Sequence, residues 1–402
     1  MSEVVITGVG LVCALGDQSS RVHEALCAGE DGFDPSPIPG AEFEGYRVSA
    51  IREFDPRHYL GAKNLRPLDR TGRLVAVAAE LALADSGWSL DRRRAQDVGL
   101  VLGTAFGSTK TIGEFDRRAM QEGPEYASPL DFANTVISAA AGQGAIWHHL
   151  RGVNSTISTG LASGLHAIGY ASQLIRSGRA TALLAGGAEE LSFELLLGYV
   201  RAGLSCAPGD VPRPFDRRRS GGILGEGAGF LALEEAELAR SRNARVIGRV
   251  EAFGAGYDSR ATMAAANGPN ALRAAITRAL GSAGPQGVGA VMSSASGHPL
   301  LDAREAVAIR DALGDRADLV PVTTIKGNLG ETQGAGGALQ TMVMLESLRA
   351  RRLPPVGGLE QPDERFGLDF VTGAPRSIDV TRALVTALAR EGNACALVVS
   401  VD

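Results

Sequence analysis

The sequence has 402 residues, of which 45% are hydrophobic, 21% are charged and only 5% are aromatic. A chain of this length corresponds to about two or three average domains and can bury a large core. The 40 basic and 45 acidic residues give a net charge of −5, no basic run exceeds three residues, and no apolar window of about 18 residues occurs. Nucleic-acid binding and a membrane span are therefore not expected.

Short β-branched runs alternate with Ala- and Leu-rich stretches through the first part of the chain, the pattern of layered α/β proteins. The sequence predicts strands at 4–7, 98–103, 180–186 and 229–233, and helices at 72–86 and 163–177. The first of these strands follows a start that lacks the basic region of a signal peptide, so we interpret it as a buried strand.

The same alternation starts again after the charged stretch 234–245. We expect strands at 246–253, 288–293 and 394–401, helices near 270–280 and 302–313, and a Gly-rich segment at 326–337 that leads into a helix. The sequence therefore predicts an α/β protein with two successive halves, residues 1–240 and 241–402.

The most specific segment begins at Arg213-Pro214-Phe215-Asp216 and continues through Arg219 and Gly221 to Gly225-Glu226-Gly227-Ala228-Gly229. Closely spaced glycines permit positive φ and close backbone approach, so we expect a tight loop around a buried carboxylate and guanidinium. We interpret Asp216 and Glu226 as structural carboxylates of this loop and not as an acid/base pair.

This compound pattern resembles the β-ketoacyl synthases of the thiolase superfamily, and the likeness extends over essentially the whole chain. It includes the segments 4–16, 69–87 and 158–175 and the pairs Asp302…Glu305 and Lys326…Gly330. The resemblance implies a thiolase-like fold, with two pseudo-equivalent α/β halves in five layers, that forms dimers. It also implies decarboxylative condensation of malonyl units on acyl carrier protein, without a cofactor or metal.

That chemistry requires a Cys thiolate at a helix N-terminus, two imidazoles that stabilise the enolate, and backbone N–H groups that form an oxyanion hole. In the positions that match the family's motifs, this chain has Leu161 for the Cys, Ser296 for the first His and Glu331 for the second. A leucine cannot be acylated, and an ionised glutamate would repel an enolate. Lys326 remains, and we expect an ion pair with Glu331. His298 is close in sequence to Ser296 and could point inward after a local shift.

The family's C-terminal Gly-Phe-Gly-Gly-Thr-Asn loop is also altered, because residues 388–393 are Leu-Ala-Arg-Glu-Gly-Asn. Asn393 matches the family's pattern, but most of the glycines that let the loop hinge are replaced by residues with a Cβ. Four independent parts of one mechanism are thus missing together.

Other reactive side chains fit structural roles better. We expect His166 to be a packed core residue, His148 and His149 to lack the spacing of a zinc site, and Ser163 to lack the GxSxG spacing of a hydrolase. The four cysteines are Cys13, Cys27, Cys206 and Cys395, which form no CxxC pair or disulfide framework, so a reducing, cytoplasmic setting fits. Cys206 is expected to be a small buried residue.

The loss of catalytic side chains resembles the chain length factor, or ketosynthase β subunit, of type II polyketide synthases, although members of that class usually carry Gln where this chain has Leu161. The resemblance implies a non-catalytic subunit that forms a heterodimer with an active ketosynthase α subunit and shapes its acyl tunnel. The acyl carrier protein would dock mainly on the active partner. The side chains expected at the tunnel or interface are Ile112, Phe115, Phe132 and Val136.

Two other functions stay open. One is a divergent thiolase-fold acyltransferase or malonyl carrier protein decarboxylase that uses His298 without covalent capture. The other is a homodimeric scaffold that binds acyl groups.

Overall fold

The computed structural model describes the chain except residues 1, 94, 96 and 262–270. A mixed sheet of eleven strands runs through both halves, in the order β12-β10-β9-β14-β15-β8-β1-β7-β6-β4-β5. Its strands in the first half are β1 (Val4–Cys13), β4 (Val98–Gly103), β5 (Asn154–Ile157), β6 (Ala182–Glu189) and β7 (Gly227–Glu235). Those in the second half are β8 (Gly248–Tyr257), β9 (Ala290–Met292), β10 (Pro321–Thr323), β12 (Asp369–Phe370), β14 (Arg382–Leu388) and β15 (Asn393–Ser400).

The helices of the first half are α1 (Ser19–Ala28), α2 (Arg57–Leu60), α3 (Arg70–Ser86), α4 (Leu90–Arg93), α5 (Thr109–Glu122), α6 (Pro129–Phe132), α7 (Ala139–Trp147), α8 (Ser163–Arg176), α9 (Phe193–Arg201) and α10 (Ala236–Ser241). Those of the second half are α11 (Ala271–Leu280), α12 (Pro299–Leu313), α13 (Lys326–Leu329) and α14 (Gly336–Ala350). Two small ribbons pair β2 (Asp34–Pro35) with β3 (Arg47–Val48) and β11 (Arg352–Leu353) with β13 (Arg376–Ser377).

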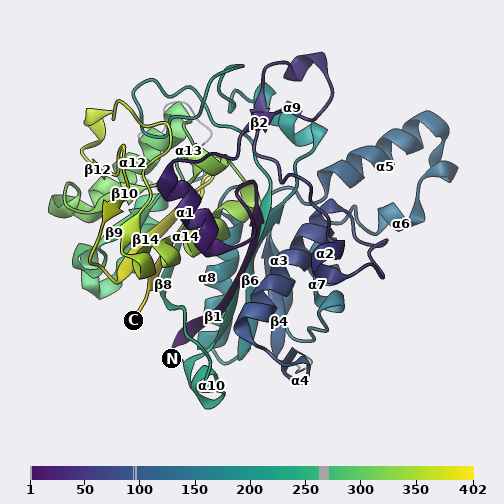
Figure 1. The fold of residues 1–402 in the computed structure, drawn as a ribbon, viewed down its shortest axis with the longest axis horizontal. Coiled ribbons are helices and arrows are strands. Elements are labelled where there is room, and N and C mark those ends of the chain that lie inside the picture. The colour runs from purple at the N-terminus through teal and green to yellow at the C-terminus, as the bar shows by residue number, and fades with distance from the viewer. Residues whose placement is uncertain (1, 94, 96, 262–270) are drawn as a thin grey trace.

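Five layers follow from the way the helices pack on this sheet (Figure 1). Helix α3 covers the outer face of β1, β6 and β7 and packs against α7, whereas α8 and α14 pack together and contact strands of both halves. Helix α11 covers the outer face of β8 and β15 and contacts α12. The layers are therefore helix, sheet, helix, sheet, helix, as the family resemblance predicts.

The two halves of the sheet are joined at β1. This strand pairs along its whole length with β7, but it pairs with β8 only through Val4–Ile6. The division into 1–240 and 241–402 remains a prediction, because the sheet is continuous across it. No helix in the described part of the chain is long and apolar enough to cross a membrane.

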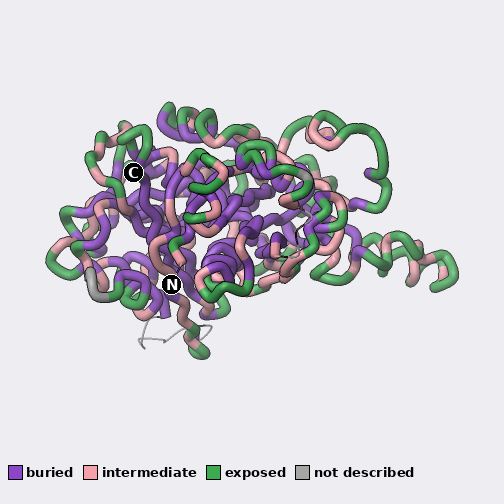
Figure 2. The backbone as a smooth tube through the Cα atoms, turned by 90° about the horizontal axis from the view of Figure 1, so that it is seen from below, coloured by how far each residue is buried: buried purple, intermediate pink, exposed green. Residues whose placement is uncertain are grey.

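Buried and exposed residues are distributed unevenly over the fold (Figure 2). Helix α14 is buried along almost its entire length, because it lies in the middle layer where both faces meet other elements. In contrast, α5 and α6 project from the body (Figure 1), and Thr111 is the one buried residue of α5. We call residues 108–138, which hold these two helices, the arm. The sequence did not predict α5 and α6 as helices.

Candidate functional site

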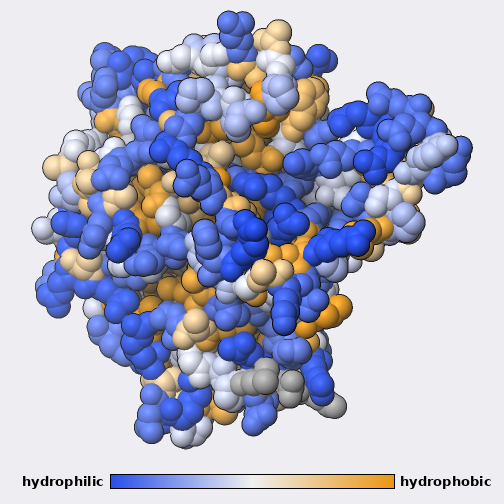
Figure 3. All heavy atoms as spheres, turned by 45° about the vertical axis from the view of Figure 1, so that its right-hand side comes forward, coloured by the Kyte–Doolittle hydropathy of each residue, from blue (hydrophilic) through white to orange (hydrophobic). Residues whose placement is uncertain are grey.

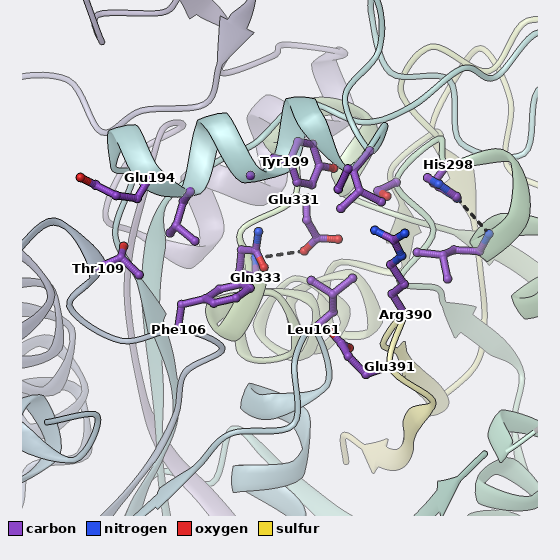
Figure 4. A pocket seen from close by; sticks show the side chains of 16 residues that line it. Phe106, Thr109, Leu161, Glu194, Tyr199, His298, Glu331, Gln333, Arg390 and Glu391 are labelled. Carbon is purple, nitrogen blue, oxygen red and sulfur yellow. Dashed lines mark hydrogen bonds between the residues drawn. The ribbon is translucent and has the colours of Figure 1, made fainter. Parts of the chain in front are cut away.

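The main candidate site is a largely apolar pocket of about 360 Å³ below α9. Helix α9 forms one wall, and Phe106 and Leu161 lie opposite it (Figure 4). The pocket is completed by the loop before α12, the segment after α13 and the turn between β14 and β15. Its lining residues are Phe106, Thr109, Leu161, Glu194, Leu195, Gly198, Tyr199, Ala202, Leu204, Ser296, His298, Leu301, Glu331, Gln333, Arg390 and Glu391.

Leu161 is the residue that the sequence predicts at the family's nucleophile position. It precedes α8, in a turn in which Gly160 has a φ of 60°, and its side chain lines the pocket. The hydroxyl of the neighbouring Ser163 is hydrogen-bonded to the backbone. Its Oγ donates to the Gly160 carbonyl at 2.6 Å and accepts from the Thr159 N–H at 2.9 Å. The start of α8 therefore presents an aliphatic group and no reactive atom to the pocket.

The cysteines do not supply a substitute nucleophile. All four are buried and form no disulfide, and none lines the pocket. Burial raises the pKa of Cys206 to about 11 and those of Cys13 and Cys395 to about 12, and it also raises the pKa of Cys27. Since the thiolate is the reactive form, these thiols are inert at neutral pH.

Glu331, which lines the pocket, forms a buried ion pair with Lys326. Lys326 Nζ lies 2.7 Å from Glu331 Oε2, and both side chains are at most 2% exposed. Glu331 Oε1 accepts a further hydrogen bond from the Gln333 N–H at 3.0 Å (Figure 4). With both oxygens engaged as acceptors, Glu331 offers a substrate no donor, whereas a histidine at this position could donate to an enolate.

The loop that holds Ser296 is fixed by two buried carboxylates of α12. Asp302 accepts from the N–H groups of Phe215 at 3.0 Å, Ser296 at 3.1 Å and Gly297 at 3.1 Å. Glu305 accepts from the N–H and the hydroxyl of Ser294 at 2.8 and 2.9 Å. Burial raises the pKa of Asp302 to about 7. These contacts place Ser296 in the pocket wall.

His298 lies at the edge of the pocket and caps α12. Its Nδ1 accepts from the N–H groups of Leu300 and Leu301, each at 3.3 Å (Figure 4). Burial lowers the pKa of His298, and the cations Arg390, Arg219 and Arg304 lower it further. The ring is therefore neutral at pH 7, with its hydrogen on Nε2.

Arg390 and Glu391 enter the pocket from the turn between β14 and β15. The Glu391 carboxylate lies so close to Gly160 that a Cβ at Gly160 would meet Oε2 at 2.5 Å. Figure 4 shows the Arg390 guanidinium beside Glu331. Asn393, the residue that matches the family in this loop, begins β15 instead, and its carbonyl accepts from the Ala389 N–H at 2.8 Å.

Comparison with known proteins shows to which family this chain belongs. The family model described as the β-ketoacyl synthase N-terminal domain matches residues 1–239, and the corresponding C-terminal domain matches residues 247–360. The chain belongs to the β-ketoacyl synthase family. Its fold has a TM-score of 0.92 to the ishigamide ketosynthase/chain length factor, with 26% identity over 100% of this chain and 99% of that chain.

Family relatives of two kinds resemble this β-ketoacyl synthase homologue. A 3-oxoacyl-[acyl-carrier-protein] synthase 2 of Coxiella burnetii is 31% identical over 99% of this chain and 98% of its own length. The tetracenomycin polyketide synthase ketoacyl synthase beta subunit of Streptomyces glaucescens is 34% identical over 98% of both chains. Membership of the β-ketoacyl synthase family thus leaves the activity to be argued from the pocket.

The Arg213–Gly229 region of this family member contains two anchored carboxylates. Asp216 accepts from the N–H groups of Glu360 and Gln361 at 3.0 and 2.7 Å. Burial opposes ionisation of Asp216, but hydrogen bonds from Arg218 and from backbone N–H groups outweigh it and lower the pKa to about 2. Glu226 accepts from Arg70 Nε at 2.8 Å and from the Leu191 N–H at 3.1 Å. Neither carboxylate lines the pocket.

The four expected tunnel or interface residues all lie on the arm. None of them is among the residues that line the pocket of the single chain. The ring centroids of Phe115 and Phe132 lie 5.8 Å apart, so these side chains connect α5 to α6. Phe132 and Val136 are nevertheless 61% and 54% exposed. Their place in a tunnel or an interface remains a prediction.

Sequence reasoning missed Glu189, which connects the base of the arm to the pocket. This buried carboxylate accepts from the N–H groups of Ala105, Phe106 and Gly107 at 2.6–3.0 Å, and from the Gly334 N–H at 3.2 Å. Burial raises its pKa to about 7. A Glu-Glu pair after an apolar run was the available signal, but the sequence does not show which backbone groups converge on it.

Two of the other histidines, His148 and His166, contact structural groups. His148 Nε2 lies 2.9 Å from the Ala76 carbonyl oxygen, and its Nδ1 lies 3.3 Å from Glu80. His166 packs beside the Phe253 ring at 5.6 Å, and burial lowers its pKa. His149 has a φ of 61°. Among the residues that the structure describes, no group of three or more His, Cys, Asp or Glu could hold a metal ion.

Proposed function

We propose that this chain is a non-catalytic chain length factor that pairs with an active ketosynthase of a type II polyketide system. The observation that carries the proposal is Leu161, an aliphatic side chain at the start of α8 where the acyl-accepting sulfur would be. The Lys326–Glu331 ion pair supports it, because it occupies the place of an enolate-stabilising imidazole with an acceptor. The likeness to a ketoacyl synthase beta subunit agrees with this assignment.

The arm offers a surface for the partner. Exposed large hydrophobic side chains are concentrated on it, namely Met120, Tyr126, Leu130, Phe132, Val136 and Ile137. Figure 3 shows hydrophobic side chains on the underside of the arm and on the body beneath it. Clusters of this kind mark protein interfaces, since apolar surface left in water is costly.

The partner would also cover β5, which is the last strand of the sheet. Within the described residues β5 pairs with β4 alone, and its side chains are partly exposed. An uncovered strand edge invites pairing with another chain. In this arrangement Ile112 and Phe115, at the inner part of the arm, would close the end of the partner's acyl tunnel, and the carrier protein would deliver the chain mainly to the partner.

The experiment is co-purification with an active ketosynthase that is co-expressed as the candidate α subunit. We expect a stable one-to-one complex that Phe132→Asp weakens by at least about tenfold, because a charge would be buried in the interface. Leu319→Asp is the matched control, since Leu319 is 68% exposed and lies in the other half of the chain. Equal binding by both variants would count against the arm as the interface.

The length of the product tests the tunnel. In the assembled pair, Ile112→Trp should shorten the polyketide, because a filled volume excludes methylenes, and Phe115→Ala should lengthen it. Mass spectrometry of the released products measures both. Unchanged products from both variants would contradict a role for these side chains in setting chain length.

A second candidate, a carrier-protein-dependent decarboxylase, is favoured by one observation, the neutral His298 at the pocket edge. This imidazole could donate from Nε2 to a thioester carbonyl without covalent capture. Incubation of the chain alone with malonyl carrier protein separates the two functions. Release of CO2 that His298→Gln abolishes would favour the decarboxylase, and no turnover is expected for the chain length factor.

A further inference from the structure

The pocket is present although Leu161 offers no nucleophile. Its lining contains both apolar and polar side chains. The apolar part consists of Phe106, Leu161, Leu195, Leu204 and Leu301. The polar side chains are distributed along the pocket, with Thr109 and Glu194 at one end, Glu331 and Gln333 in the middle, and His298 and Arg390 at the other end (Figure 4). Small-molecule sites have this composition, with apolar walls and a few polar groups that orient one end of the ligand.

Arg390 is the polar group that distinguishes this pocket. Among the residues that the structure describes, no hydrogen bond or ion pair engages its guanidinium. The other charged side chains of the lining differ in this respect, because Glu331 is paired with Lys326 and Glu194 with Arg117 at 3.1 Å. Glu391 is the remaining acid, and it lies against Gly160.

The cations around His298 favour an anion at this end of the pocket, and the Glu331 carboxylate beside Arg390 is itself paired with Lys326. The ring of His298 carries its hydrogen on Nε2, and three guanidinium groups act on it, those of Arg390, Arg219 and Arg304. Arg219 forms an ion pair with Asp363 at 3.0 Å. Its charge therefore adds to the positive potential near His298, but it is not available to bind a ligand directly. A guanidinium pairs best with a planar carboxylate, to which it can donate two parallel hydrogen bonds.

We propose that the pocket binds a free aliphatic monocarboxylate non-covalently, with the carboxylate at Arg390 and the alkyl chain against Leu161, Leu195 and Leu204. The inference rests on the proposed function in one respect, the absence of a nucleophile that could capture the chain. The ligand is defined by its two ends, an anionic head at an exposed arginine and an apolar tail against the leucines of the lining. Such a molecule would arise by hydrolysis of an acyl thioester.

The test compares ligands with the same tail and different heads. Decanoate, decanol and decyltrimethylammonium are titrated into the full-length chain by calorimetry. We expect decanoate to bind at least about tenfold more tightly than decanol, the difference that a charge-assisted hydrogen bond supplies. The ammonium compound should bind most weakly. Equal affinities for decanoate and decanol, or no binding of either, would overturn the proposal.

Two pairs of variants locate the ligand. Arg390→Gln should reduce decanoate affinity to that of decanol, and Arg240→Gln, at a 70% exposed arginine, is the control. Gly198→Leu should weaken both ligands, because a Cβ at Gly198 meets nothing within 4 Å and the new side chain would extend into the pocket. Gly142→Leu is its control, since a Cβ there also meets nothing within 4 Å. Unchanged decanoate binding in Arg390→Gln would sink the assignment.

Glu391→Gln gives a change in the opposite direction. Removing the one unpaired carboxylate of the lining should tighten decanoate binding severalfold and leave decanol unaffected. Intact-mass spectrometry after incubation with decanoyl carrier protein separates this proposal from the proposed function. An acyl adduct on the chain would refute the non-catalytic role, whereas the head-group comparison would still decide the carboxylate site.

Discussion

The loops that surround the pocket and the side chains that face into it differ in what their polar groups do. Around the pocket, Asp216, Glu226 and Asp302 each accept several hydrogen bonds from distant parts of the backbone. Facing the pocket, Leu161 and Ser296 are the residues that we predict at the positions of the family's nucleophile and first histidine. The loops are thus fixed by buried carboxylates, and no cysteine lines the pocket that they surround.

On the proposed function, positioning and chemistry are separable in this fold. A carboxylate that satisfies backbone N–H groups stabilises the folded chain whether or not a reaction takes place there. A nucleophilic side chain, in contrast, does not stabilise the folded chain. It can therefore be replaced when a partner subunit performs the reaction. The prediction is that substitutions in the surrounding loops affect folding strongly, whereas substitutions in the pocket affect binding.

Glu226→Ala should have the largest effect. It leaves Arg70 without its partner and removes the acceptor of the Ile51 and Leu191 N–H groups. Breaking a buried ion pair and orphaning buried donors costs about 5 kcal/mol of unfolding free energy. Denaturant unfolding measures the loss, with the exposed Glu237→Ala as control. If Glu226→Ala and Glu237→Ala lowered the unfolding free energy equally, the loop carboxylates would be no more important for folding than surface ones.

The Lys326–Glu331 pair offers a sharper test, because it belongs to both regions. Lys326→Met should cost about 3–5 kcal/mol, since it leaves the Glu331 charge buried without its cation. The double variant Lys326→Met/Glu331→Leu should recover most of that loss, because two apolar side chains need no partner. Denaturant unfolding of both proteins gives the comparison. A Glu331→Gln variant of unchanged stability would indicate that the ion pair does not support the pocket.

Sequence patterns predicted the parts of the molecule that depend on local composition. The glycines between Gly221 and Gly229 indicated a tight loop around a carboxylate, and Leu161 could be placed before a helix because the Ala-rich run that follows it is helical. The Lys326–Glu331 ion pair could be predicted because the two residues are separated by a single short helix.

What the sequence could not predict is which distant segments meet. Tyr199 reaches the pocket from α9 and Arg390 from the turn between β14 and β15, and no local pattern relates them. The helices of the arm were missed as well, because they are short or mostly polar and make few contacts with the core that would impose an apolar period. His298 was open to two interpretations, and the structure shows it as the cap of α12 at the pocket edge.

The smallest predicted effect concerns the base of the arm, where Glu190 accepts from the Lys110 N–H at 2.8 Å and its second oxygen has no partner among the described residues. Burial raises the pKa of Glu190 to about 8 from an ordinary value of 4.5. Between these values the folded chain retains a proton that the unfolded chain has released, so the free energy of unfolding falls as the pH rises.

Glu190→Gln removes this titration, because the amide is neutral at every pH and its oxygen can still accept from Lys110. Thermal unfolding from pH 5 to pH 8 should therefore give a flatter profile for the variant, which gains about 3 kcal/mol over the parent chain across this range. The slope should decrease without vanishing, because Glu189 and Asp302 also have raised pKa values of about 7. Parallel profiles for the two proteins would mean that Glu190 is ionised in the fold, and that the base of the arm tolerates a buried charge as the Lys326–Glu331 site does.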